Sequence, residues 1–309
     1  MAEENYFSAL EFGAISAGTG GKKVWDFKTG QTAYDWFMCA RYLNDLLGYQ
    51  KMQEQLGAEH QDAVSSSVLA TYHEFIHHQS DDLGLNFDKW LAVQCTECHE
   101  PRFYELGSTL MGCIEGMAVV NQWLQRLEET PLELESVIWI GVDNSSFMNM
   151  AAKQLHQQYQ LQLFEDFKAQ PLKTDVFFAK GVSLLYAIDS VADFRHILGS
   201  SRLSLFDYSF SKKDQFSTTI GTGKVVNYFT KEAFLKSLPD GHVCYFRSDK
   251  HKEEEETLFY ELLIGEPELV ERFIHRQQEL VEKIRQNFCS QSNSYFLRAD
   301  VKNIVWQPL

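Results

Sequence analysis

Short apolar runs alternate with longer helical patterns through the middle of the chain, and this alternation restricts the fold more than any other feature. The runs are rich in aromatic and β-branched residues and predict strands at 103–106, 137–142, 161–164, 175–179 and 202–206. Helical patterns fill the intervals at about 110–127, 146–159 and 190–199. Strands that alternate with helices pair in parallel and are covered on both faces, so the pattern predicts a doubly wound α/β core.

The two ends of the chain follow other patterns. Residues 1 to about 100 are expected to be mainly helical, because apolar residues recur at three- and four-residue spacing over 32–56 and 62–78. We therefore expect a helical lid or cap region at 1–100 and a core at 101–309. After the core strands the sequence predicts a helix, a hairpin, a charged helix and an extended piece at 231–237, 243–247 with 257–264, 266–286 and 294–306.

Composition excludes several classes of protein. Lysine and arginine number 28 against 43 aspartate and glutamate, which leaves a formal charge of -15. This charge repels phosphate backbones and anionic lipid headgroups, so we expect neither a nucleic-acid nor a membrane partner. The sequence also lacks a signal peptide, which predicts a cytoplasmic protein. The six cysteines are too sparse for a disulfide scaffold and are expected to be free thiols.

Polar and small residues follow the predicted strands where a ligand would bind in an open α/β sheet. They are Glu105, Gly107, Ser108 and Thr109 at the first strand, Asp143 and Asn144 at the second, Asp166 and Phe167 at the third, and Gly181, Val182 and Ser183 at the fourth. A glycine permits a tight turn with the backbone close to a ligand. A carboxylate can accept hydrogen bonds from both hydroxyls of a ribose, and an aromatic ring can lie on the face of an adenine.

This order of motifs resembles the class I S-adenosylmethionine-dependent methyltransferases. The resemblance implies a Rossmann-like, mostly parallel seven-stranded sheet whose last two strands are the predicted hairpin. It assigns Glu105 and Gly107 to the first motif and Asp143 to the ribose. Asp166 with Phe167 corresponds to the adenine-side motif, and Gly181, Val182 and Ser183 to the fourth strand exit.

The sequence departs from the family in two respects. Thr109 and Met111 stand where the family's first motif has glycines. Glu105 and Asp143 are 38 positions apart, some dozen more than most members show, which predicts a longer first helix or a loop at 128–135.

The resemblance implies methyl transfer from S-adenosylmethionine to a small-molecule nitrogen, oxygen or carbon acceptor. If a general base is used, the candidates are His73, His77, Asp207 and Tyr208, the last two expected just beyond the fifth strand. A homodimer is compatible with the sequence.

Two other functions stay open. The missing glycines favour a methyltransferase-like binding protein that has lost catalysis. His73-Glu74-Phe75-Ile76-His77 matches the H-E-x-x-H motif of zinc peptidases, although no extended ligand pattern follows, and we expect no catalytic metal there. Cys95, Cys98 and nearby histidines can form a structural zinc site, but free thiols are favoured. A nicotinamide enzyme is disfavoured because G-x-G-x-x-G is absent after the first strand.

Overall fold

The computed structural model describes residues 25–26, 31–32, 86–108, 111–125, 127–143, 149, 152–153, 156, 159–179, 183–219, 225–248, 256–287 and 305–309. Most of the predicted helices at 32–56 and 62–78 therefore lie outside the described residues. Thr32 does not begin a helix, because it pairs with Trp25 between the short antiparallel strands β1 (Trp25–Asp26) and β2 (Gln31–Thr32).

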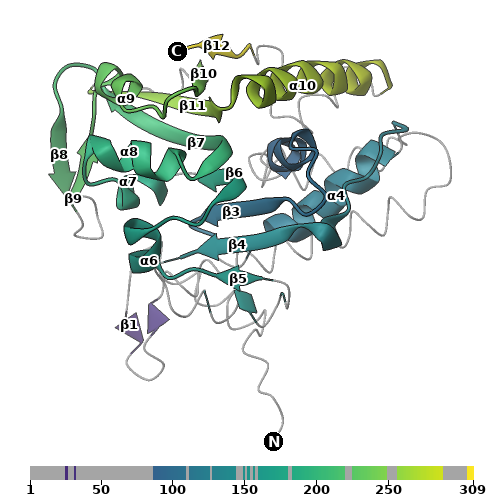
Figure 1. The fold of residues 1–309 in the computed structure, drawn as a ribbon, viewed down its shortest axis with the longest axis horizontal. Coiled ribbons are helices and arrows are strands. Elements are labelled where there is room, and N and C mark those ends of the chain that lie inside the picture. Colours follow the sequence, from purple (N-terminus) through teal and green to yellow (C-terminus); the bar gives the residue numbers. More distant parts are fainter. Residues whose placement is uncertain are drawn as a thin grey trace, which may run out of the picture.

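An eight-stranded sheet forms the centre of the molecule, with the order β12-β10-β11-β7-β6-β3-β4-β5 (Figure 1). Its strands are β3 (Arg102–Leu106), β4 (Ile138–Val142), β5 (Gln160–Leu161), β6 (Thr174–Ala179), β7 (Ser201–Ser211), β10 (Val243–Ser248), β11 (Thr257–Gly265) and β12 (Gln307–Pro308). The prediction of seven strands is wrong by one, because residues near the C-terminal end add β12 beside β10.

Strand directions confirm the doubly wound prediction. β3 pairs in parallel with β4 and β6, which lie on its two sides, and β5 and β7 extend the sheet outward from them. The chain therefore reverses its direction of winding between β3 and β6, which is the switch point where ligands bind in such sheets. The predicted hairpin is present as β10 and β11, and β11 runs antiparallel to β7.

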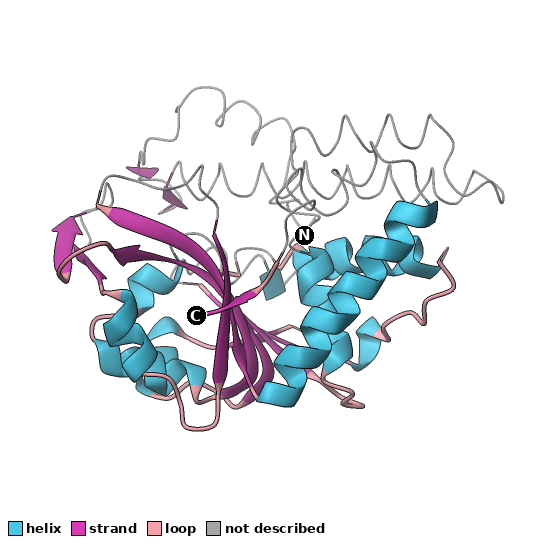
Figure 2. Cartoon of the chain, turned by 90° about the horizontal axis from the view of Figure 1, so that it is seen from above, coloured by secondary structure: helices cyan, strands magenta, loops and turns pink. Residues whose placement is uncertain are grey.

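Helices cover both faces of the sheet, as Figure 2 shows from above. One face packs against helical residues 86–95, α4 (Cys113–Gln125) and α10 (Pro267–Asn287), with Trp90, Met117 and Phe273 fully buried. The other face packs against α6 (Phe164–Ala169), α7 (Ser183–Ala187), α8 (Val191–Leu198) and α9 (Lys231–Lys236). None of the helices in the described ranges is long and apolar enough to cross a membrane.

Local hydrogen bonds explain where several helices begin. The Asp193 carboxylate accepts the backbone N–H of Ser190 at 2.7 Å at the start of α8. The Thr230 hydroxyl accepts the N–H of Ala233 at 3.2 Å at the start of α9. Both bonds satisfy amides that a helix N-terminus leaves without a partner inside the helix.

Three boundaries differ from the prediction. β7 continues to Ser211, because β11 pairs with it from Leu203 to Ser211. The predicted strand at 161–164 ends at Leu161, and α6 follows with the ring of Phe167 turned into the core. A hairpin of β8 (Phe216–Thr219) and β9 (Val225–Tyr228) was not predicted, because four of its eight residues are polar and neither strand forms an apolar run.

The long spacing between the first two core strands comes from a loop. α4 ends at Gln125, and the 3-10 helix η1 (Leu134–Ser136) leads into β4. Buried Glu129 anchors the loop to α10 through ion pairs with Arg276 and Lys283.

A buried polar network joins the sheet to the helices on one face. Arg247 of β10 pairs with Glu261 of β11 and donates to Asp88 at 2.6 Å. Gln277 of α10 donates to Asp88 at 2.8 Å and accepts the indole N–H of Trp306 at 2.8 Å. The network links residues from five separate parts of the chain, so it fixes the helices to the β10 side of the sheet.

Candidate functional site

The exits of β3, β4 and β6 lie at one level of the sheet. Leu106, the last residue of β3, pairs with Val142 at the end of β4 and with Ala179 at the end of β6. Residues that follow these three strands therefore meet at the switch point. This is the arrangement that the sequence predicted for the first, second and fourth strand exits.

A glycine is required in the turn after β3. Gly107 has a φ of 74°, a conformation that other L residues adopt only at a cost. A Cβ atom at this position would overlap the hydroxyl of Ser183, the first residue of α7 after β6. Two of the predicted site residues, Gly107 and Ser183, are thus in direct contact across the switch point.

Tyr159 packs against the same turn, although no sequence pattern predicted it as a site residue. Its hydroxyl lies 3.4 Å from the Ser108 hydroxyl. A Cβ atom on Gly141 of β4 would lie 2.5 Å from the Tyr159 ring and 2.6 Å from Ser108 Oγ. The lack of a side chain at Gly141 therefore makes room for the Tyr159 and Ser108 contact.

Met111 has a left-handed backbone conformation, which glycine adopts readily and other residues rarely. Its φ is 58°, and its side chain is fully buried in the core cluster of α4 and α10. The N–H of Met111 donates to the carbonyl of Ser108 at 2.8 Å, which closes the turn. The chain therefore keeps a left-handed residue where the family has a glycine, and burial of the side chain offsets the backbone strain.

Glu105 is held inside the protein beneath the turn. Lys89 Nζ donates to its carboxylate at 2.6 Å, and both side chains are largely buried. Lys89 also lies 4.3 Å from the ring centre of Phe178. Burial raises the pKa of the Cys113 thiol well above its usual value, and the neighbouring Glu105 raises it further, so Cys113 keeps its proton beside the pair.

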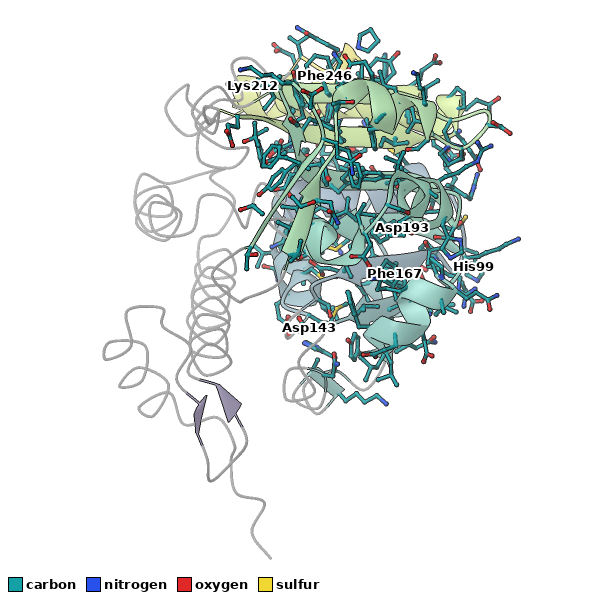
Figure 3. The ribbon with its side chains drawn as sticks, turned by 90° about the vertical axis from the view of Figure 1, so that its left-hand side faces the viewer. His99, Asp143, Phe167, Asp193, Lys212 and Phe246 are labelled. Atoms are coloured by element: carbon teal, nitrogen blue, oxygen red, sulfur yellow. The ribbon has the colours of Figure 1, made fainter. Side chains whose placement is uncertain are left out.

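The predicted residues of the second and third strand exits lie apart. Asp143 is half-buried after β4, while Asp166 is exposed in α6. The ring of Phe167 is fully buried and stacks with Tyr104 and Phe177. Figure 3 shows Asp143 well to one side of Phe167, whose ring belongs to the core beneath α6.

Asp207 and Tyr208 lie within β7, so the prediction that they follow the strand is wrong. Successive side chains of a strand face opposite sides, and the two therefore cannot serve one site. Asp207 is on the sheet face that carries Leu205 and Phe103. It follows Phe206, which pairs with the last residue of β6. Tyr208 is on the other face, where its hydroxyl donates to the Asn227 carbonyl at 2.8 Å.

The remaining predicted residues lie outside the part of the chain that the structure describes. They are His73, His77, Thr109, Asn144, Gly181 and Val182.

Cys95 and Cys98 form no disulfide. Burial raises the pKa of Cys95 to about 12. Cys98 Sγ lies 3.4 Å from an Asp175 carboxylate oxygen. Within the described ranges, no three histidine, cysteine, aspartate or glutamate side chains are grouped so that they could hold a metal ion.

Comparisons with known proteins were made by sequence and by structure. No protein-family model matches the chain, and a search of curated proteins finds no match. Similar solved structures include the N-terminal domain of EvdMO1 with SAH bound, at a TM-score of 0.40 and 11% identity over 60% of this chain and 81% of that one.

Two further solved structures are also similar to this chain. A TehB-like SAM-dependent methyltransferase from Corynebacterium glutamicum has a TM-score of 0.32 at 10% identity, covering 58% of this chain and 87% of that one. Streptomyces venezuelae DesVI has a TM-score of 0.37 at 10% identity, covering 66% of this chain and 99% of that one. The fold assignment rests on the strand order and directions described above.

The Lys89 and Glu105 pair yields a prediction about stability. Lys89→Met leaves a buried carboxylate without its cation, so we expect a loss of about 3 to 5 kcal/mol in the free energy of unfolding. The double variant Lys89→Met with Glu105→Gln should recover most of this loss. Arg195→Met, which breaks an exposed pair with Asp240, is the control and should change little. Urea denaturation measures all three, and a double variant no more stable than Lys89→Met would contradict the account.

The Gly107 turn yields a second prediction. Gly241 also has a positive φ, 80°, but a Cβ atom there meets nothing within 4 Å. Gly241→Ala should therefore cost about 1 kcal/mol of stability from backbone strain alone. Gly107→Ala has the same strain and in addition overlaps Ser183, so its cost should be larger by about 1 to 3 kcal/mol. Equal costs in chemical denaturation would show that Ser183 moves away freely.

Met111 yields a third prediction, a reversal of the usual order of glycine and alanine. Both Met111 variants lose the buried side chain, but only glycine relieves the left-handed backbone, so Met111→Gly should be about 1 kcal/mol more stable than Met111→Ala. Met117 is equally buried in the interior of α4 and is the control. There, alanine should be more stable than glycine by about 1 kcal/mol. The same order at both positions, measured by denaturation, would refute the strain at Met111.

Proposed function

We propose that the chain binds S-adenosylmethionine at the exits of β3, β4 and β6 and transfers its methyl group to a small-molecule acceptor. The observation that carries the proposal is the close approach of Gly107 to Ser183 at the switch point, with Asp143 at the next strand exit. Because Gly107 has no Cβ atom, the Ser183 hydroxyl packs directly against the turn, which brings a hydroxyl to the switch point. The neighbouring carboxylate suits the hydroxyls of a ribose.

The charges and hydroxyls near the turn support this cofactor. Asp143 would accept hydrogen bonds from the ribose. Two hydroxyls lie next to Gly107: that of Ser108, the next residue in the chain, and that of Ser183, which contacts Gly107 from the exit of β6. When bound, S-adenosylmethionine supplies a methyl group that its sulfonium charge has already activated. The protein then needs mainly to align the acceptor and to exclude water.

A base is needed only for an acceptor that must lose a proton. Asp207 would take that role. It is one residue beyond the position in β7 that pairs with the last residue of β6, and its side chain is on the same face of the sheet as Glu105. Tyr208 is a poorer candidate, since its hydroxyl already donates to a backbone carbonyl on the opposite face. The acidic balance of the chain suits a neutral or cationic acceptor. In this proposal the residues before the helical segment 86–95, which packs on the sheet, cover the acceptor, and residues 101–309 hold the cofactor.

A second candidate is a binding protein of the same fold without catalysis. Met111 favours it, because a buried methionine in a left-handed conformation shows that the glycine motif has changed. Titration of purified protein with S-adenosylmethionine, together with a search for methylated product, separates the two candidates. Binding with no transfer to any acceptor tested favours the second.

Calorimetry with S-adenosylhomocysteine tests the proposed site. Asp143→Ala removes two ribose hydrogen bonds to a charged acceptor, so we expect binding to weaken by about 2 to 4 kcal/mol. Asp240→Ala is the control, because this carboxylate is exposed on the surface and should leave the affinity unchanged. NADH is the control ligand and should not bind. Wild-type affinity in Asp143→Ala would remove Asp143 from the site, and no binding by the unaltered protein would refute the function.

A further inference from the structure

The first two amides of the turn after β3 are already used inside the fold. The N–H groups of Gly107 and Ser108 both donate to the carbonyl of Val142, at 2.7 and 3.3 Å. A backbone amide that is bonded in this way is not free to donate to a ligand. These bonds attach the backbone of the turn to β4. The donors that remain for a ligand at Ser108 are therefore in its side chain, and the position of that side chain depends on its own contacts.

One side-chain anchor comes from a distant part of the sequence. Tyr159 precedes β5, and its hydroxyl reaches Ser108, which is 51 positions earlier, at 3.4 Å. The Tyr159 ring lies against Gly141, where a Cβ atom would be 2.5 Å from it. Tyr159 itself is held in place by its N–H, which donates to the carbonyl of His156 at 3.2 Å. The contact thus connects the turn with β4 and with the segment before β5.

We propose that Tyr159 is a positioning residue for the cofactor and that its hydroxyl acts through Ser108 to hold the turn between β3 and α4. The proposal rests on the proposed function, since it concerns the same site. It assigns to this chain a side-chain support where the family has glycines: the Tyr159 hydroxyl supplements the backbone hydrogen bonds of the turn.

The protonation state of Tyr159 suits a hydrogen-bond donor to the turn. Burial raises the pKa of its hydroxyl to about 12; the hydrogen bond with Ser108 lowers the pKa, and the carboxylates of Asp143 and Glu105 raise it. The phenol therefore keeps its proton at neutral pH and can donate to Ser108 Oγ. When it does so, the hydroxyl hydrogen of Ser108 is free to turn toward another acceptor. Removing the phenol oxygen leaves the ring packing intact but loosens this arrangement.

Binding of S-adenosylhomocysteine, measured by calorimetry, tests the proposal. Tyr159→Phe and Ser108→Ala should each raise the Kd by about three- to tenfold, which is the effect of one hydrogen bond. The double variant should be no weaker than the weaker single variant, because both changes break the same contact. Thermal unfolding of each variant shows that it is folded at the temperature of the titration.

Tyr104→Phe is the matched control. Its hydroxyl is also buried and donates to Gln162 at 2.5 Å, but the side chain belongs to the core on the opposite face of the sheet. We expect Tyr104→Phe to lower the Tm while leaving the Kd unchanged. A residue with only a structural role would behave like Tyr104, so the Kd distinguishes positioning from packing.

Each outcome decides between the claims. An unchanged Kd in Tyr159→Phe, or effects of the two single variants that multiply in the double variant, would overturn the role of Tyr159 while leaving the cofactor site in place. If the unaltered protein does not bind S-adenosylhomocysteine, the proposed function fails, and the role of Tyr159 fails with it. A raised Kd in both singles with no further rise in the double supports the proposal.

Discussion

The two parallel ladders of β3 determine where every residue of the candidate site lies. β3 pairs with β4 on one side and β6 on the other, and its last residue is in register with the last residue of each neighbour. Both faces of β3 are buried, through Phe103 on one side and Tyr104 on the other. Because these ladders fix the strand ends at one level, the turn after β3 meets the start of α7, and the contact of Gly107 with Ser183 follows.

Sequence patterns predicted the central strands because those strands are buried on both faces and read as continuous apolar runs. They failed where the structure depends on partners far along the chain. The extension of β7 to Ser211 is decided by β11, and the burial of Phe167 by Tyr104 and Phe177. The positions of the predicted strands placed Gly107 and Ser183 at the strand exits. No local pattern marks Tyr159, and its proposed positioning role rests on its contact with Ser108.

Side-chain contacts stabilise the turn after β3, in a segment where the family that the sequence resembles has glycines. Met111 is buried in a left-handed conformation, Ser108 contacts Tyr159, and Glu105 beneath them is paired with Lys89. The geometry of the site is consequently tied to the packing of the core. Substitution of the side chains that contact the turn is thus expected to alter ligand affinity as well as stability, whereas core positions away from the turn, such as Tyr104, should affect stability alone.

The edges of the sheet have a consequence for how copies of the chain behave in solution. An exposed edge strand invites pairing with another molecule, because its backbone groups have no partner. Here the sheet ends at β5 on one side and β12 on the other, each only two residues long. Pro308 in β12 has no N–H to offer a further strand. The outermost strands in the described part of this sheet therefore offer few backbone groups for edge-to-edge pairing with another copy.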